Sequence, residues 1–240
     1  MKPKAYHEMF AHEDQYWWYR VLDELVFRFI DEMALPASPT VLDAGCGTGR
    51  LLAKLQTRQP TMGIDFSPLA LDYCAKRGLR SQLGQASLNA LPFVANQFDL
   101  IVSCDVLYHR AVEDQRALNE LYRVLKPNGK LILHLPALEA LRGTHDEQVD
   151  GRERYTTTSI RQRVEQAGLR VIKCSYRLMF TLPLIYALRK FKQSEGESDF
   201  SELSPSTDFL ITTLMRFENQ LISRVNLPIG SSVFLVAEKI

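Results

Sequence analysis

The alternation of short apolar runs with amphipathic stretches between Thr40 and Tyr176 constrains the fold more than any other feature of this sequence. Five runs predict strands, and each is almost continuously apolar, as in strands that are covered on both faces. They are TVLDAG at 40, TMGIDF at 61, FDLIVS at 98, GKLILHLP at 129 and LRVIKCSY at 169. Helical patterns between them occupy residues 50–56, 68–77, 113–124 and 158–167. This order predicts βαβ units in an α/β fold, with a mostly parallel sheet and helices on both faces.

Two regions lie outside the alternation. Residues 1–35 carry a helical pattern that ends before the breaker stretch PASP. Residues 178–228 are apolar and helical, and they are interrupted by the acidic stretch QSEGESDFSELSPSTD before a final strand pattern, SSVFLVAEK. Because about 50 residues exceed what a connection between two strands requires, we expect a cap or lid there.

The length of 240 residues fits a single domain. We expect four parts within it: a helical cap at 1–38, a cofactor-binding core at 39–177, a helical lid insertion at 178–229 and the last strand at 230–240.

Charge, cysteine content and apolar runs limit which partners, metal sites and cellular locations we expect for this chain. With 29 Lys+Arg and 28 Asp+Glu, the net charge of +1 provides no global field that attracts nucleic acid, so we expect no nucleic-acid partner. The four cysteines form no C-x-x-C pair, which argues against a metal site. The N-terminal MKPKAYHEMFAHED has no apolar h-region, and the longest apolar-leaning run, residues 178–188, is too short to cross a bilayer. We therefore expect a cytoplasmic protein with reduced thiols.

The most informative motif is VLDAGCGTG at residues 41–49, where an apolar strand enters a glycine-rich turn and a helix follows near Arg50. Glycines let the backbone approach a ligand, and the helix N-terminus presents free N–H groups to an anionic group. The spacing differs from the dinucleotide fingerprint G-x-G-x-x-G, because Arg50 stands where that fingerprint requires Gly or Ala. No Walker A continuation follows either. Asp43, just before the turn, suits a ligand with both an ammonium and a carboxylate.

Asp65 ends the second predicted strand, 18 residues after Gly47. An acid at this position can accept hydrogen bonds from both hydroxyls of an adenosine ribose. The alternative is that Asp65 only caps the helix that starts at Pro68. The spacing relative to the glycine turn favours ribose binding.

Several motifs in a fixed order resemble those of class I S-adenosylmethionine-dependent methyltransferases over residues 40–175. They are DAGCGTG, GIDFSPLAL, ALPF with FDLIVSCDVLYH, and LNELYRVLKPNGKLILHLPA. The last two are similar to a bacterial type 11/12-like subgroup, and YWW at 16–18 with THDEQVDGRERYT looks like a branch with an N-terminal tryptophan pair. The resemblance implies a Rossmann-like, doubly wound seven-stranded sheet whose last strand is antiparallel. It also fits the helical N-terminal cap and the helical insertion before that strand.

The resemblance implies S-adenosylmethionine as cofactor and S-adenosylhomocysteine as product. The methionine end of the cofactor would lie against Asp43, Gly45 and Gly47, and Asp65 would bind the ribose.

Further roles follow from the same resemblance. Phe66 would lie against the adenine, and Ser87 with Leu88 would meet its edge. Many relatives have an Asp at the Ser87 position, which would accept from the adenine amino group. Asp105 follows the fourth strand and would face the transferred methyl group.

An alcohol acceptor needs a general base, and a histidine with an ordinary pKa suits neutral pH. Two histidines are candidates, His109 after the fourth strand and His145 after the fifth. Relatives commonly have Glu at the Tyr108 position and a second His near Gly151, and this chain has neither. The alternative for His109 is a structural residue that orders its turn.

Trp17 and Trp18 are adjacent on a predicted helix, so their side chains point about 100° apart. We expect one to pack into the core and the other to close over the cofactor or acceptor, with a purely structural pair as the alternative. Arg152 and Arg154 with Tyr155 have two interpretations, a solvated basic face or a site for an anionic acceptor.

We therefore expect methyl transfer from S-adenosylmethionine to a small-molecule, sugar or lipid-linked acceptor, with oxygen as the first choice of acceptor atom. The alternatives are N- or C-methylation of a natural-product intermediate, or a cofactor-binding protein without catalysis. A nucleic-acid methyltransferase is disfavoured by the charge balance and by the lack of an N-P-P-Y-type tetrapeptide after the fourth strand. The segment MFTLPLIYALRKF at 179–191 is expected to pack within the lid, or to line a hydrophobic acceptor channel or touch a membrane surface. Oligomeric state is left open.

Overall fold

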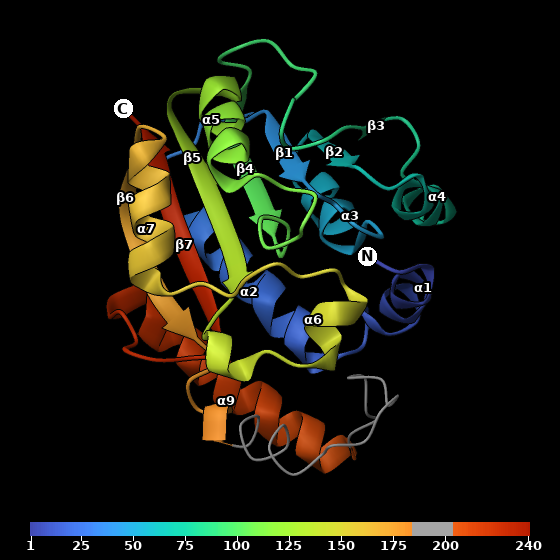
Figure 1. The fold of residues 1–240 in the computed structure, drawn as a ribbon, viewed down its shortest axis with the longest axis vertical. Helices are drawn as coiled ribbons and strands as arrows, with labels where there is room; N and C mark the ends of the chain where they lie inside the picture. Colours follow the sequence, from blue (N-terminus) through green and yellow to red (C-terminus); the bar gives the residue numbers. More distant parts are fainter. Residues whose placement is uncertain (184–203) are drawn as a thin grey trace.

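The computed structural model describes residues 1–183 and 204–240, which form one seven-stranded sheet in the order β3-β2-β1-β4-β5-β7-β6 (Figure 1). The strands are β1 (Val41–Ala44), β2 (Thr61–Asp65), β3 (Leu83–Gln85), β4 (Phe98–Cys104), β5 (Leu125–Pro136), β6 (Leu169–Arg177) and β7 (Ser232–Lys239). The pairs among β1 to β5 are parallel, and β7 runs antiparallel to both β5 and β6. The predicted fold class is confirmed, and the antiparallel last strand lies inside the sheet.

Helices cover both faces of this sheet. They are α1 (Pro3–His12), α2 (Trp17–Glu32), α3 (Arg50–Gln56), α4 (Pro68–Lys76), α5 (Asp114–Val124), α6 (Thr144–Gln148), α7 (Thr157–Gln166) and α9 (Pro205–Arg224). α2 packs against one face through Phe29, whose ring centroid lies 4.9 Å from that of Phe234 in β7. α7 lies on the opposite face beside α5 (Figure 1), where Cys174 of β6 reaches the carbonyl of Thr157.

The core elements agree closely with the hydrophobic pattern. The four predicted core helices match α3, α4, α5 and α7 to within one residue at each end. Local signals account for this agreement: Pro68 opens α4, and Thr156 caps α7 with its side chain accepting from the backbone N–H of Ser159.

The sequence patterns do not predict β3. Its three residues, Leu83–Gln85, show no apolar alternation, and they become a strand because they pair in register with Gly63, Ile64 and Asp65 of β2. A strand this short is specified by its neighbour rather than by its own composition.

The described part of the predicted insertion contains a turn at 179–181, two helical residues at 182–183 and the helix α9. α9 packs along α2, where Asn219 donates to the carbonyl of Val21 at 2.7 Å. Most of the acidic stretch and of the apolar segment 179–191 lies outside the described residues. Within 1–183 and 204–240, no helix combines the length and the apolar character that a bilayer crossing demands.

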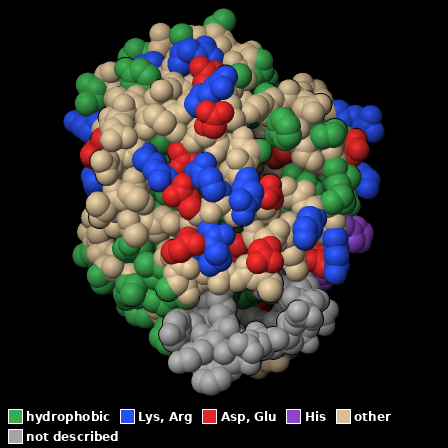
Figure 2. Space-filling view, in the orientation of Figure 1, with side chains coloured by type: hydrophobic (Ala, Val, Ile, Leu, Met, Phe, Trp, Pro, Cys, Tyr) green, Lys and Arg blue, Asp and Glu red, His purple; other side chains and the backbone are tan. Residues whose placement is uncertain are grey.

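Acidic and basic side chains are interspersed on the face that carries α5 and α7 (Figure 2). On these helices Arg116 pairs with Glu113, and Arg161 pairs with Glu165 at 3.4 Å. This face therefore presents a mixed surface rather than a field of one sign.

Candidate functional site

A cavity of about 750 Å³ lies at the carboxyl ends of β1, β2, β4 and β5, which is where ligands bind in open α/β sheets. Residues of α1, α2 and α6 complete its walls. The cavity brings together the predicted site residues Asp43, Gly45, Gly47, Asp65, Phe66, Ser87, Leu88, Asp105 and His109. His145 belongs to α6, and its side chain lies outside the described residues.

Asp43 stands where β1 enters the glycine-rich turn. It is 2% exposed, and its Oδ2 has no hydrogen-bond partner among the described residues. Burial raises the pKa of Asp43 to about 7. Gly45 adopts φ +91°, and a Cβ there would lie 2.3 Å from Cγ2 of Val106. The turn thus offers an unpaired carboxyl oxygen on a backbone with no space for a side chain at Gly45.

Asp65 joins two loops through its carboxylate. Its Oδ2 accepts from the backbone N–H of Gly47 at 2.9 Å, and its Oδ1 accepts from that of Ser67 at 2.9 Å. Because Ser67 immediately precedes α4, the carboxylate both caps that helix and holds the glycine turn. Burial raises the pKa of Asp65. Ribose binding stays a prediction.

The residues expected at the adenine lie along the same cavity. Phe66 is 66% exposed, Leu88 is buried, and the Ser87 hydroxyl accepts from the backbone N–H of Asn89 at 3.2 Å. An exposed ring beside the cavity is compatible with stacking on a base. The adenine contacts stay predictions.

Buried ion pairs tie the N-terminal helices to the glycine turn, which sequence motifs alone did not indicate. Glu13, next after α1, accepts from the hydroxyl of Thr48 and from Nη2 of Arg77, the latter at 2.8 Å. Burial raises the pKa of Glu13, opposed by Arg50 and Arg77. Arg50 in turn pairs with Asp23 of α2. The cap is therefore part of the site wall.

Asp105 and His134 form a pair at the ends of β4 and β5. The Nδ1 of His134 lies 3.1 Å and 3.0 Å from the two carboxylate oxygens of Asp105. The Nε2 has no hydrogen-bond partner among the described residues, and the imidazole lines the cavity. Trp18 packs against it edge to face, with ring centroids 5.4 Å apart. One imidazole nitrogen is thus held by Asp105, and the other is buried without a hydrogen-bond partner among the described residues.

The sequence motifs do not single out His134, because it lies within the apolar run LILHLP, which predicts a strand. A titratable side chain near the carboxyl end of an otherwise apolar, buried strand was the available signal. The pairing with Asp105, 29 residues earlier, depends on the adjacency of β4 and β5.

His109 occupies a different environment from His134. Its ring stacks on that of Tyr108 at 4.4 Å, and burial lowers its pKa. Its Nδ1 has no partner among the described residues. Catalytic roles for His109 and His145 stay predictions.

Trp17 and Trp18 pack against different neighbours, as their adjacent positions on one helix predict. Trp17 packs in an apolar cluster with Val21, Leu178 and Met215, whereas Trp18 faces His134. Both rings also line the cavity, so the two tryptophans differ in their packing partners and not in their access to the cavity.

The interpretation of Arg152 and Arg154 as a solvated basic face is wrong. The side chain of Arg154 is 5% exposed and pairs with Asp146 at 2.9 Å, and Arg152 donates to the carbonyl of Val112 at 2.7 Å. Arg152 also pairs with Asp114. Both guanidinium groups form ion pairs and hydrogen bonds with other residues of the chain. These contacts depend on the tertiary structure, and sequence spacing does not reveal them.

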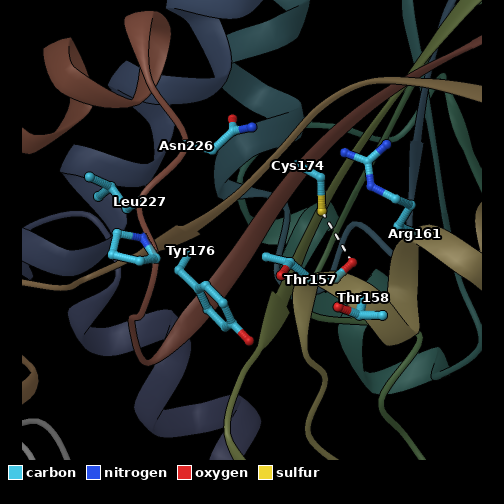
Figure 3. A pocket seen from close by; sticks show the side chains of 8 residues that line it. Thr157, Thr158, Arg161, Cys174, Tyr176, Asn226 and Leu227 are labelled. Carbon is cyan, nitrogen blue, oxygen red and sulfur yellow. Dashed lines mark hydrogen bonds between the residues drawn. The ribbon is translucent and has the colours of Figure 1, made fainter.

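A second hollow, of about 300 Å³, lies between the start of α7 and the end of β6 (Figure 3). The Cys174 thiol points across it toward the carbonyl of Thr157, and the positively charged Arg161 lies at its rim. Its lining contains none of the carboxylates or histidines of the larger cavity, and we assign no chemistry to it.

Comparison with known proteins agrees with this geometry. Residues 41–129 match a family model described as a methyltransferase domain. The chain is 32% identical over 130 residues to the probable tRNA methyltransferase 9B of Bos taurus, which covers 53% of this chain and 28% of the relative. It is 35% identical over 108 residues to the tRNA (carboxymethyluridine(34)-5-O)-methyltransferase alkbh8 of Xenopus tropicalis, which covers 44% of this chain and 17% of the relative. The chain thus spans about a quarter or less of these relatives' length.

Solved structures share the fold. A possible histamine N-methyltransferase of Thermotoga maritima superposes with a TM-score of 0.62 at 20% identity, covering 99% of this chain and 96% of that one. Phosphoethanolamine N-methyltransferase 2 of Haemonchus contortus, solved with S-adenosylmethionine, gives 0.60 at 17% identity, covering 90% of this chain and 52% of that one.

The expectation of no nucleic-acid partner is wrong, because both curated relatives are named as methyltransferases of tRNA. The error has a physical reason: net charge is a sum over the whole chain, and it does not describe any one surface.

The N-terminal tryptophan pair as a mark of a particular branch stays a prediction. The matched domain model is that of a methyltransferase domain, and the sheet topology agrees with the fold of solved methyltransferases. The chain therefore contains a methyltransferase domain at residues 41–129, in a fold that it shares with S-adenosylmethionine-dependent methyltransferases.

Proposed function

We propose that this protein transfers the methyl group of S-adenosylmethionine to an oxygen atom of its acceptor. The observation that carries the proposal is the Asp105–His134 pair, which places an imidazole nitrogen without a partner among the described residues on the wall of the cavity. Oxygen is the acceptor atom that gains most from such a base, because an alcohol must lose its proton as it is methylated.

The residues at the carboxyl ends of β1 and β2 have the chemical groups that S-adenosylmethionine requires. The Oδ2 of Asp43, without a partner among the described residues, suits the ammonium of the methionine end, and Gly45 and Gly47 line the cavity beside it. Asp65 and Phe66 provide a carboxylate and an exposed ring beside the same cavity. When bound, the cofactor supplies an electrophilic methyl group on a positively charged sulfur.

His134 acts on the acceptor through its Nε2. A carboxylate accepts only from a protonated nitrogen, so Asp105 holds the neutral imidazole with its proton on Nδ1 and its lone pair on Nε2. The Nε2 then takes the proton of an acceptor hydroxyl. Trp18 limits the movement of the imidazole and excludes water from one side of it.

The acceptor is a small polar unit that enters the cavity. A small molecule, a sugar or a lipid-linked sugar is the sequence-based expectation. A nucleoside within tRNA is a second candidate, favoured by the names of the curated relatives, one of which specifies methylation on oxygen.

The test uses radiolabelled S-adenosylmethionine with total tRNA and with a fractionated small-metabolite extract, followed by NMR of the methylated product. We expect an O-methyl signal, and we expect His134→Gln to lower the rate by about 10²–10⁴. An N-methyl or C-methyl product would contradict the proposal. So would a protein that binds the cofactor but methylates neither pool.

His109→Gln is the matched control, because it removes another imidazole from the same cavity wall. S-adenosylhomocysteine affinity, measured by calorimetry, is expected to stay within about twofold of wild type for His134→Gln, which shows that the variant is folded. A larger loss of rate in His109→Gln than in His134→Gln would move the base assignment to His109.

A further inference from the structure

Arg177, the last residue of β6, is a buried, positively charged residue that has no role in the reaction proposed above. It is 1% exposed, and none of its three guanidinium nitrogens has a hydrogen-bond partner among the described residues. Burial lowers the pKa of Arg177 to about 10, so the side chain is still charged at neutral pH. A buried charge without hydrogen bonds is costly to fold, and a ligand that supplies the missing partners explains its presence.

The sheet register places Arg177 on the sheet face that carries Ser232 and His134, which line the acceptor end of the cavity. Ser232 of β7 lies opposite both Arg177 of β6 and Pro136 of β5, so the three side chains share one face of the sheet. His134, two residues before Pro136, lies on that face as well. The Ser232 hydroxyl, like the Nε2 of His134, has no partner in the described part of the chain.

Trp18 connects these polar groups. Its ring lies 6.0 Å from Cζ of Arg177 and 5.4 Å from the centroid of His134. Trp18, Ser232 and His134 all line the cavity. One aromatic wall therefore runs from the proposed base to the buried guanidinium.

The protein's own carboxylates near Arg177 are committed elsewhere. Glu218 of α9 is fully buried, and its two oxygens accept from the backbone N–H groups of Leu178 at 2.5 Å and Phe180 at 3.0 Å. Both oxygens of Asp105 face His134. These acids lower the electrostatic cost of the charge on Arg177 without occupying its donors.

We infer that Arg177, with the hydroxyl of Ser232, binds a carboxylate of the methyl acceptor, so that the acceptor is a hydroxy acid whose hydroxyl reaches His134. The guanidinium fork matches the two oxygens of a carboxylate. A singly charged carboxylate suits the site better than a doubly charged phosphate, because Glu218 and Asp105 already supply negative charge nearby. The inference deepens the proposed O-methyl transfer and rests on it.

The test measures binding rather than turnover, so it does not depend on knowing the natural acceptor. The probes are 3-hydroxybenzoate and its neutral amide, 3-hydroxybenzamide, titrated by calorimetry into the full chain saturated with S-adenosylhomocysteine. We expect wild type to bind the acid at least about tenfold more tightly than the amide. Equal affinities of the two probes would overturn the inference, and so would preferential binding of phenyl phosphate.

Arg177→Met removes the charge and keeps an apolar side chain of similar length. The preference for the acid should fall to within about twofold, while Arg161→Met, at the rim of the smaller hollow, should keep it. Without ligand, Arg177→Met should unfold at a higher temperature than wild type, because it removes an unpaired buried charge. A lower unfolding temperature together with an unchanged preference would show a structural role and refute the subsite.

Two further variants keep the outcomes separate. If Arg177→Met fails to fold, Arg177→Lys provides the test, because lysine keeps the charge but cannot bind both carboxylate oxygens as a guanidinium does. We expect Arg177→Lys to reduce the preference for the acid. An undiminished preference would count against the subsite. His134→Gln should retain the preference for the acid. If that preference is present but no O-methyl product forms with any acceptor, the proposed reaction fails and the carboxylate subsite stands.

Discussion

We expect Asp43 to make the stability and the cofactor affinity of this protein depend on pH in opposite directions. In the folded protein without ligand, burial raises the pKa of Asp43 from 3.8 to about 7. A carboxyl whose pKa is higher in the folded than in the unfolded state contributes stability at low pH, and that contribution is lost as the pH rises through the folded pKa. Between pH 5 and pH 8 the unfolded chain is ionised at Asp43, whereas the folded protein loses its proton near pH 7.

The magnitude follows from this difference. The free energy of unfolding changes by about 1.4 kcal/mol per pH unit while only the folded state holds the proton. From pH 5 to the folded pKa, this amounts to a loss of about 3 kcal/mol. Urea unfolding of wild type and Asp43→Asn at pH 5 and pH 8 isolates the effect, because the amide cannot ionise. The exposed Asp31→Asn is the control and should follow wild type.

Ligand binding should show the reverse dependence. If Asp43 binds the ammonium of the cofactor's methionine end as proposed, its ionised form binds more tightly, so S-adenosylhomocysteine affinity should rise as the pH increases through 7. At pH 6, calorimetry in two buffers of different ionisation enthalpy should detect the release of nearly one proton for each ligand bound. Asp43→Asn should release fewer protons. Parallel stability curves for wild type and Asp43→Asn, or equal proton release by the two proteins, would refute the role assigned to Asp43.

Two other substitutions test the cofactor end of the cavity. Asp65→Ala should weaken S-adenosylhomocysteine binding by at least about tenfold in calorimetry, because it removes the carboxylate that is predicted to accept from both ribose hydroxyls; unchanged affinity would overturn the ribose assignment. Gly45→Ala should lower the free energy of unfolding by about 1–3 kcal/mol, because its Cβ would collide with Val106 at a positive φ. Gly78→Ala is its control, since Gly78 has φ +85° and no atom within 4 Å of the added Cβ. Equal losses in the two glycine variants would exclude the collision as the cause.

The sequence by itself determined the α/β class, the core helices, six of the seven strands and the cofactor type. These features depend on short-range signals: apolar runs predict buried strands, a 3.6-residue period predicts helices, and the turn at 45–49 follows directly from its glycines. The predicted cofactor-site residues Asp43, Asp65 and Phe66 line one cavity because each lies at or directly after the carboxyl end of one of two neighbouring parallel strands.

Only the tertiary structure decided which polar groups meet. His134 reaches Asp105 because β4 and β5 are neighbours, and Glu13 reaches Arg77, 64 residues away, because α1 folds over the glycine turn. Within residues 1–183 and 204–240, the lack of a hydrogen-bond partner for the Arg177 guanidinium likewise results from tertiary packing and not from a local pattern. Local patterns report what one segment prefers, whereas these contacts depend on strand order and register, which arise from the packing of segments distant in the chain.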